Sequence, residues 1–208
     1  MLTGDFVSAS GVILYRDLSG EKNLWLKLFL KGFGAVNVTA KKSSGDTEPF
    51  VWGKFGLKKK KNSVNYYIDE FETADDMLLL RRSRATFLTA LKWTKMIMTR
   101  LDDGQPDDDL LADLYWSMKL LEDVHVPAEV SDWKFLWRWL ESWGLAPDLA
   151  DFYAQNNFNH DEIVLLTQIS LLNTKGVGNL FSKNLSPNIR KNSFNIAAEL
   201  AEKFLIEK

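Results

Sequence analysis

The chain has 208 residues, of which 46% are hydrophobic, enough to bury one sizeable core or two small ones. It contains no cysteine, which excludes disulfides, thiolate metal sites and cysteine nucleophiles and fits a reducing compartment. Residues 1–100 carry 17 Lys and Arg against 10 Asp and Glu, whereas residues 101–208 carry 9 against 18. This division predicts a polyanion-binding surface in the first half and a protein partner for the second.

The first 71 residues show the period of two that is typical of half-buried strands. Apolar residues alternate at 12–15 and 24–30, and further strands are expected at 35–40, 49–57 and 64–70, with turn-forming residues between them. Five short strands with no helix to cover them predict a small closed antiparallel barrel of the OB or SH3 type, and the strand count does not separate the two. Within 24–30, Trp25, Lys27 and Phe29 are expected to face outward.

The period changes at Asp75, which predicts a long helix over 75–104 and a domain boundary near Thr73. Further helices are expected at 110–123 and 130–143, and weaker ones at 161–172 and 189–206. The spacing of Trp133, Leu136, Trp137 and Leu140 indicates a buried helix face. The predicted fold class is therefore α+β, with a five-stranded barrel at 1–73 and a helical domain at 74–208.

No group of residues in the sequence indicates catalysis. His125 and His160 are 35 positions apart and lack the spacing of a zinc site. Asp107, Asp108 and Asp109 lack the loop of an EF-hand and are better explained as acidic residues at a helix N-terminus. The segment 176–178 lacks the rest of a phosphate-binding loop. We expect no enzyme, no metal and no cofactor, and no apolar run approaches the roughly 18 residues of a membrane span.

Three stretches of the chain carry a resemblance to a known family. The first is GVILYRDLSGEKNL at 11–24, and the second is LFLKGFGAVNVTAKK at 28–42, followed by Pro49 and Phe50. The third and most specific is FLWRWLESWGLAPDL at 135–149. Together they resemble the bacterial RecO family of recombination mediators, whose F-x-x-R-L-L-x-x-L-G-Y-x-P-D-L segment is similar to the third stretch. The chain departs from many members after Leu149, because it lacks their four-cysteine zinc site, and the tail after Asn156 matches weakly.

The resemblance implies an N-terminal OB barrel that binds single-stranded DNA in DNA repair. A member of the family anneals complementary strands coated with single-stranded DNA-binding protein, joins RecR and helps to load RecA, in the cytoplasm and without catalysis. It also implies a pocket in the helical domain for the acidic, Phe-ended tail of single-stranded DNA-binding protein, to which we assign Arg138 and Trp139. The alternatives are a protein-interaction adaptor with a diverged barrel and an RNA-binding OB protein.

Basic residues of the first half are the candidate contacts to phosphate. They are Arg16, Lys27, Lys31, Lys41, Lys42, Lys54, Lys58, Lys59, Lys60, Lys61, Arg81, Arg82 and Arg84. The lysine run at 58–61 lies in a predicted loop between the last two strands, where it either grips a nucleic-acid backbone or forms a solvated turn. Trp25, Lys27 and Phe29 form either a stacking platform or a packing surface, and the three arginines either extend the groove or pair with Glu72, Asp75 or Asp76.

Overall fold

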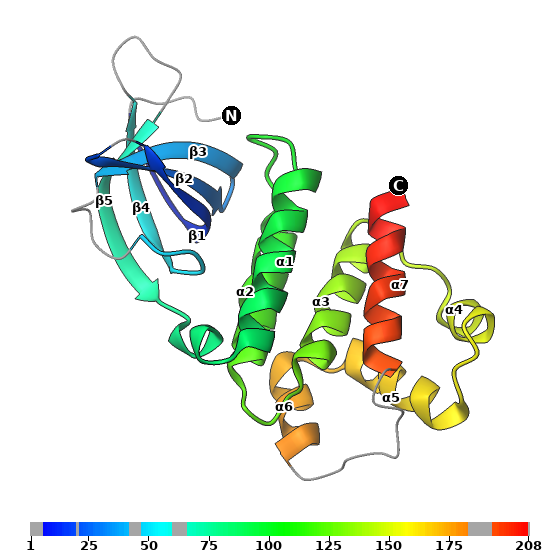
Figure 1. Cartoon of the computed structure of the whole chain (residues 1–208). Coiled ribbons are helices and arrows are strands. Elements are labelled where there is room, and N and C mark those ends of the chain that lie inside the picture. The colour runs from blue at the N-terminus through cyan, green and yellow to red at the C-terminus, as the bar shows by residue number, and fades with distance from the viewer. Residues whose placement is uncertain (1–5, 20, 42–46, 60–65, 183–192, 208) are drawn as a thin grey trace. The chain divides into compact units, whose positions relative to one another are not determined.

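A computed structural model of the chain divides into two compact units, Met1–Leu111 and Ala112–Lys208 (Figure 1). The structure describes residues 6–19, 21–41, 47–59, 66–182 and 193–207. The first unit holds a closed five-stranded sheet, and the helices follow it along the chain. The α+β class predicted from the sequence is therefore confirmed.

The sheet consists of β1 (Phe6–Ser19), β2 (Asn23–Leu30), β3 (Gly34–Lys41), β4 (Trp52–Lys59) and β5 (Tyr66–Asp75). Its closed order is β1-β2-β3-β5-β4, because the long β1 pairs antiparallel with β2 through its second half and with β4 through its first. The β3–β5 pair is parallel, and β5 also pairs antiparallel with β4. All five predicted strands are present, although β4 and β5 end later than expected.

The interior of the sheet follows the period of two. Leu24, Leu26, Leu28 and Leu30 of β2 are buried in one cluster that also holds Phe55. Facing residues come from the other strands: Val7, Ala9, Ile13, Val36, Val38, Ala40, Val51, Leu57, Tyr66 and Ile68. Burial of these apolar side chains is the main stabilising contribution to this unit, at about 25 cal/mol per Å² of apolar surface.

The helix predicted to begin at Asp75 begins nine residues later in the chain. β5 continues to Asp75. Within this strand, Phe71 stacks on Phe55 of β4 with ring centroids 4.6 Å apart. A 3-10 helix, η1 (Leu78–Arg82), follows Met77, and α1 (Arg84–Arg100) follows Ser83. Met77 has a φ of 47°, a left-handed conformation that prevents one continuous helix from running through this segment.

The boundary predicted near Thr73 falls inside β5, within the first compact unit. The unit extends to Leu111 because α1 packs on the sheet. Phe87 of α1 lies edge-to-face on Phe50 with centroids 5.6 Å apart, and Phe50, at a φ of 73°, donates its backbone N–H to Ile13 O. The sheet and α1 therefore form one packed body.

The helices after α1 are α2 (Asp108–Glu122), α3 (Ala128–Ser142), α4 (Leu149–Gln155), α5 (His160–Leu171), α6 (Thr174–Ser182) and α7 (Ser193–Glu207). The predictions at 110–123, 130–143 and 161–172 are confirmed within two residues, and α7 lies inside the range predicted at 189–206 except for its last residue. Asp107 caps α2 by accepting from Leu110 N at 2.9 Å, as its acidic N-terminus predicted. Two helices were not predicted from the sequence: α4, which is short, and α6, which contains two glycines.

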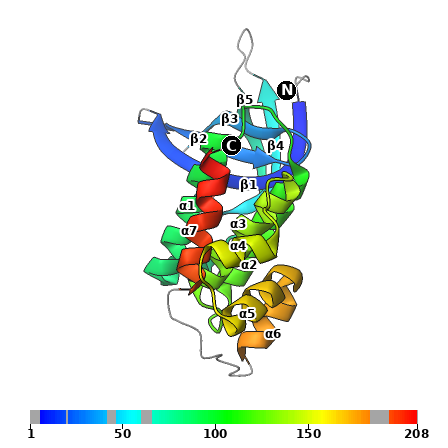
Figure 2. The same ribbon diagram turned by 90° about the vertical axis from the view of Figure 1, so that its right-hand side faces the viewer.

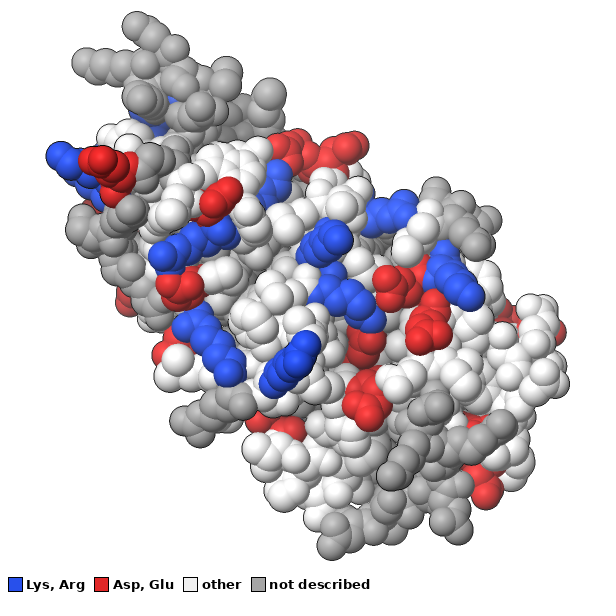
Figure 3. Space-filling view, in the orientation of Figure 1, with Lys and Arg blue, Asp and Glu red and all other residues white. Residues whose placement is uncertain are grey.

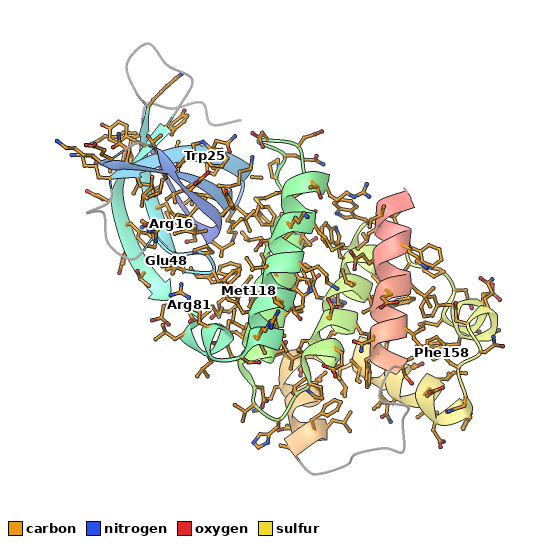
Figure 4. All side chains as sticks on the ribbon, in the orientation of Figure 1. Arg16, Trp25, Glu48, Arg81, Met118 and Phe158 are labelled. Atoms are coloured by element: carbon orange, nitrogen blue, oxygen red, sulfur yellow. The ribbon has the colours of Figure 1, made fainter. Side chains whose placement is uncertain are left out.

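Aromatic rings form the core of the second unit. Trp133 packs on Trp137 and Phe152 with centroids 4.9 and 5.7 Å apart, and Phe152 stacks on Phe158 (Figure 4). Trp133, Leu136, Trp137 and Leu140 are all buried, which confirms the predicted core face of α3. α7 lies alongside α3 (Figure 2). Among the described residues, no helix has the length and apolar character needed to cross a membrane.

Candidate nucleic-acid interface

The register of the sheet aligns outward-facing residues across all five strands. Starting from β1, each of the following residues is the cross-strand partner of the next: Asp17, Trp25, Thr39, Tyr67, Lys58 and Phe6. Trp25 and Tyr67 each expose 37% of their surface and Phe6 exposes 50%, whereas their chain neighbours Leu24, Leu26 and Tyr66 are buried. We call Phe6, Lys58, Tyr67, Thr39 and Trp25 the aromatic row. Adjacent strands are about 4.8 Å apart, so the row presents three rings and one ammonium group across the sheet.

Trp25 is held in place by a second exposed ring. Tyr15 of β1 lies edge-to-face on Trp25 with centroids 5.9 Å apart and interplanar angle 70°. Such a contact contributes roughly 0.5–1.5 kcal/mol beyond the area buried. The prediction that Trp25 faces outward is confirmed. Tyr67, which the sequence placed only near the lysine run, is the second ring that the register adds.

Of the two alternatives predicted for Lys27 and Phe29, a stacking platform or a packing surface, the structure supports the packing surface. Both side chains are buried, because the segment after α1 crosses this end of the sheet. Gly104 N donates to Ala35 O at 2.8 Å. The Asp103 carboxylate accepts from Lys27 Nζ and, at 2.7 Å, from Asn37 Nδ2. Lys27 is therefore a structural cation in this state, and the exposed row ends at Trp25.

Ion pairs occupy two more of the predicted phosphate contacts. Arg16 pairs with Glu48 (Figure 4), and Lys58 Nζ lies 2.6 Å from the Asp69 carboxylate. The hydrogen bond to Asp69 raises the pKa of Lys58, so this group stays fully charged. Arg81 Nη2 donates to Pro49 O at 3.0 Å, and not to the acidic residues before η1. The sheet thus offers fewer unpaired cations than its composition suggests.

The remaining predicted cations divide into two groups. The side chains of Lys31, Lys41, Lys54, Lys59 and Arg84 are exposed. Lys42, Lys60 and Lys61 lie outside the described residues, as does the side chain of Arg82. Lys58 and Lys59 belong to β4, so the lysine run begins inside a strand and not in the loop.

The second unit contains a hollow of about 430 Å³ between α2, α3 and the segment that joins α5 to α6. Arg138 lines it, with Nε 3.5 Å from Asp113 Oδ1 and Nη1 3.6 Å from Glu141 Oε2. The hollow is also lined by Trp116, which has 56% of its surface accessible, and by Leu171. A signal for Trp116 was present in the sequence, because it lies off the face formed by Leu110, Leu114, Met118 and Leu121.

Trp139, the other predicted partner-binding residue, is fully buried, so that prediction is wrong. It packs on Phe135 and Trp143, with centroids 5.6 and 5.3 Å apart. The prediction assumed that α3 buries only one face, as an amphipathic surface helix does, whereas α3 buries rings on more than one face. Only Arg138 of the predicted pair reaches the hollow.

Lys134 forms the floor of the hollow. Its Nζ donates to Ile169 O at 2.9 Å and to Leu172 O, the last carbonyls of α5 and its cap. Burial, and secondarily the charge of Arg138, lowers the pKa of Lys134 to about 8, against the opposing effects of Asp113 and Glu141. The cation that ties α3 to the end of α5 therefore titrates in the mildly alkaline range.

This pKa predicts a stability that rises with pH. Between about pH 8 and 10.5 the unfolded chain holds a proton on Lys134 that the folded chain has lost, so raising the pH favours the folded state. We expect the free energy of unfolding, from urea titrations at pH 7.5 and 10, to rise more in the wild type than in Lys134→Met. The exposed Lys175→Met variant is the control and should follow the wild type. An identical trend in Lys134→Met and the wild type would contradict the assignment.

The described residues contain no group of three or more His, Asp or Glu side chains arranged to hold a metal ion. His125 and His160 are both exposed. Comparison of the sequence with protein-family models and with curated proteins finds no match. The site must therefore be interpreted from its own chemistry, in which exposed rings and cations predominate.

Proposed function

We propose that the protein binds single-stranded DNA across the aromatic row and acts without catalysis. The observation that carries the proposal is the alignment of Phe6, Tyr67 and Trp25 on one outer track of the closed sheet. Each base stacked on such a ring contributes roughly 1–3 kcal/mol irrespective of its identity, and a neighbouring ammonium group adds phosphate affinity. A double helix hides its base faces, so the row favours single strands.

We interpret the closed sheet as an OB barrel. It has five strands, its long first strand pairs with both β2 and β4, and its last strand lies between β3 and β4. OB barrels bind oligonucleotides over the face of their second and third strands and in the loops after the first and fourth. Trp25 and Thr39 lie on that face here. Lys58 and Lys59 are the last residues of β4, immediately before the fourth loop.

Together with the resemblance to the RecO family, these features support a recombination mediator. In this proposal the protein anneals complementary strands coated with single-stranded DNA-binding protein, joins RecR and assists RecA loading in the cytoplasm during DNA repair. Charge neutralisation is the physical step, because it removes the repulsion between two polyanions. In the second unit, Arg138 and Trp116 would receive the acidic, aromatic-ended tail of single-stranded DNA-binding protein.

The test is fluorescence anisotropy of a labelled oligothymidine at rising salt. We expect binding whose logarithm falls linearly with the logarithm of salt concentration, with a slope of about −0.7 for each phosphate contact. An RNA oligonucleotide of the same length serves as competitor and decides between DNA and RNA. An absence of binding to either at low salt would contradict the proposal.

A protein-interaction adaptor is the second candidate. It is favoured by the pairing of Arg16, Lys27 and Lys58 with carboxylates and by the hollow around Trp116. An adaptor would bind an acidic peptide that ends in phenylalanine, with loss of binding in Arg138→Ala, and would leave the oligothymidine free. Because both candidates predict binding of the peptide, the oligothymidine titration separates them.

A further inference from the structure

α1 and the 3-10 helix before it carry charge of one sign only. The 25 residues 77–101 contain six Lys and Arg and no Asp or Glu. Unlike Arg16, Lys27 and Lys58 of the first unit, Arg84 and Lys95 have no acidic partner among the residues that the structure describes, and both are exposed. Blue side chains gather over this part of the first unit (Figure 3).

The helix places three of these cations, Arg84, Lys92 and Lys95, on one face. Arg84, Leu88, Lys92, Lys95 and Thr99 follow at intervals of three or four residues, so they form a stripe along α1. Arg84 and Lys95 are about 16 Å apart along the axis. The opposite face is buried through Ala90, Trp93, Thr94 and Ile97, which holds the stripe rigid. A straight, cationic and fixed track results.

The stripe differs from the aromatic row in having no accessible ring. Phe87 is packed edge-to-face on Phe50, and Trp93 is buried. Unpaired bases gain no stacking energy here, whereas the phosphates of a double helix need only cations at regular spacing. The stripe therefore suits a duplex backbone better than a single strand.

We propose that the α1 stripe is a second nucleic-acid site, which binds the phosphate backbone of double-stranded DNA without reading its sequence. This inference rests on the proposed function for its biological meaning, because a strand-annealing protein must release a single strand and meet a duplex. The row engages the bases of one strand, and the stripe attracts the paired product through Arg84, Lys92 and Lys95. The two sites act on different forms of the same polymer.

The test compares two variants of equal charge, Arg84→Gln/Lys95→Gln and the control Lys175→Gln/Lys203→Gln, whose lysines are exposed in the second unit. Binding of a labelled 20-base-pair duplex is titrated at rising salt. We expect the salt slope to lose about 0.9 for each removed contact, about 2 in all, in the stripe variant only. Its affinity for oligothymidine, which the aromatic row binds, should fall by a smaller factor than its affinity for the duplex, and its rate of annealing complementary oligonucleotides should fall.

Equal duplex binding by the two variants would overturn the inference, as would an equal loss of oligothymidine and duplex binding in the stripe variant. Vesicles containing one-third phosphatidylserine test the competing ligand, since exposed Leu78, Leu79 and Leu88 lie on the same segment. Binding to vesicles with no stripe-dependent binding to the duplex would also overturn it. If oligothymidine fails to bind but the duplex binds through the stripe, the proposed single-strand binding by the aromatic row is contradicted and the proposed duplex binding by the stripe is not.

Discussion

Replacing both Trp25 and Tyr67 with alanine is expected to weaken binding of oligothymidine by roughly 30-fold or more. Each ring is outward-facing, 37% exposed and aligned on the row through Thr39. A lost stack costs roughly 1–3 kcal/mol for each base, or about fivefold to 150-fold for each ring. The salt slope should change little, because the substitutions remove rings and leave the cations in place. Anisotropy at several salt concentrations measures both quantities.

The matched control is Trp116→Ala, which removes an exposed tryptophan from the second unit. It should leave oligothymidine binding unchanged. Both variants should keep a wild-type circular dichroism spectrum, since the replaced rings lie outside the core clusters of the two units. The aromatic row has no role in binding if the double variant and the control have equal affinities.

Replacing Gly34 with alanine is expected to cause the largest loss of stability in the first unit from a single methyl group. Gly34 has a φ of 71°, and a Cβ there would overlap the backbone carbonyl of Gln105. The clash adds a cost of about 1–3 kcal/mol to the roughly 1–2 kcal/mol of a left-handed alanine. The segment 103–105 must then move away from β3, which exposes Lys27. Urea denaturation measures the loss of stability.

Gly32 provides a nearly ideal control, because its φ is 73° and no atom lies within 4 Å of the position of its Cβ. Gly32→Ala should therefore lose only the conformational contribution. Hydrogen exchange supplies the local measurement: the amide of Gly104, which donates to Ala35 O, should lose protection in Gly34→Ala and keep it in Gly32→Ala. Equal stabilities of the two variants would show that the segment packs loosely on the sheet.

Local patterns in the sequence were sufficient for most of the fold. Alternation of apolar residues located all five strands, and the stripe of Trp133, Leu136, Trp137 and Leu140 located the buried face of α3. The same alternation placed Trp25 on the outer surface. These predictions succeed because each depends on neighbours a few residues away, whose geometry the backbone fixes. The predicted start of α1 was wrong because β5 continues to Asp75, where the period changes, and Met77 then has a left-handed backbone conformation.

By itself, then, the sequence determined the order of elements, the basic character of the first half and the outward direction of Trp25. Only the tertiary structure decided which charged and aromatic groups are available. Lys27 is covered because Asp103, 76 residues later, pairs with it, and Trp139 is buried because α3 packs rings on several faces. The aromatic row exists because the register brings Phe6, Tyr67 and Trp25 together. Such pairings join distant parts of the chain, and no local period records them.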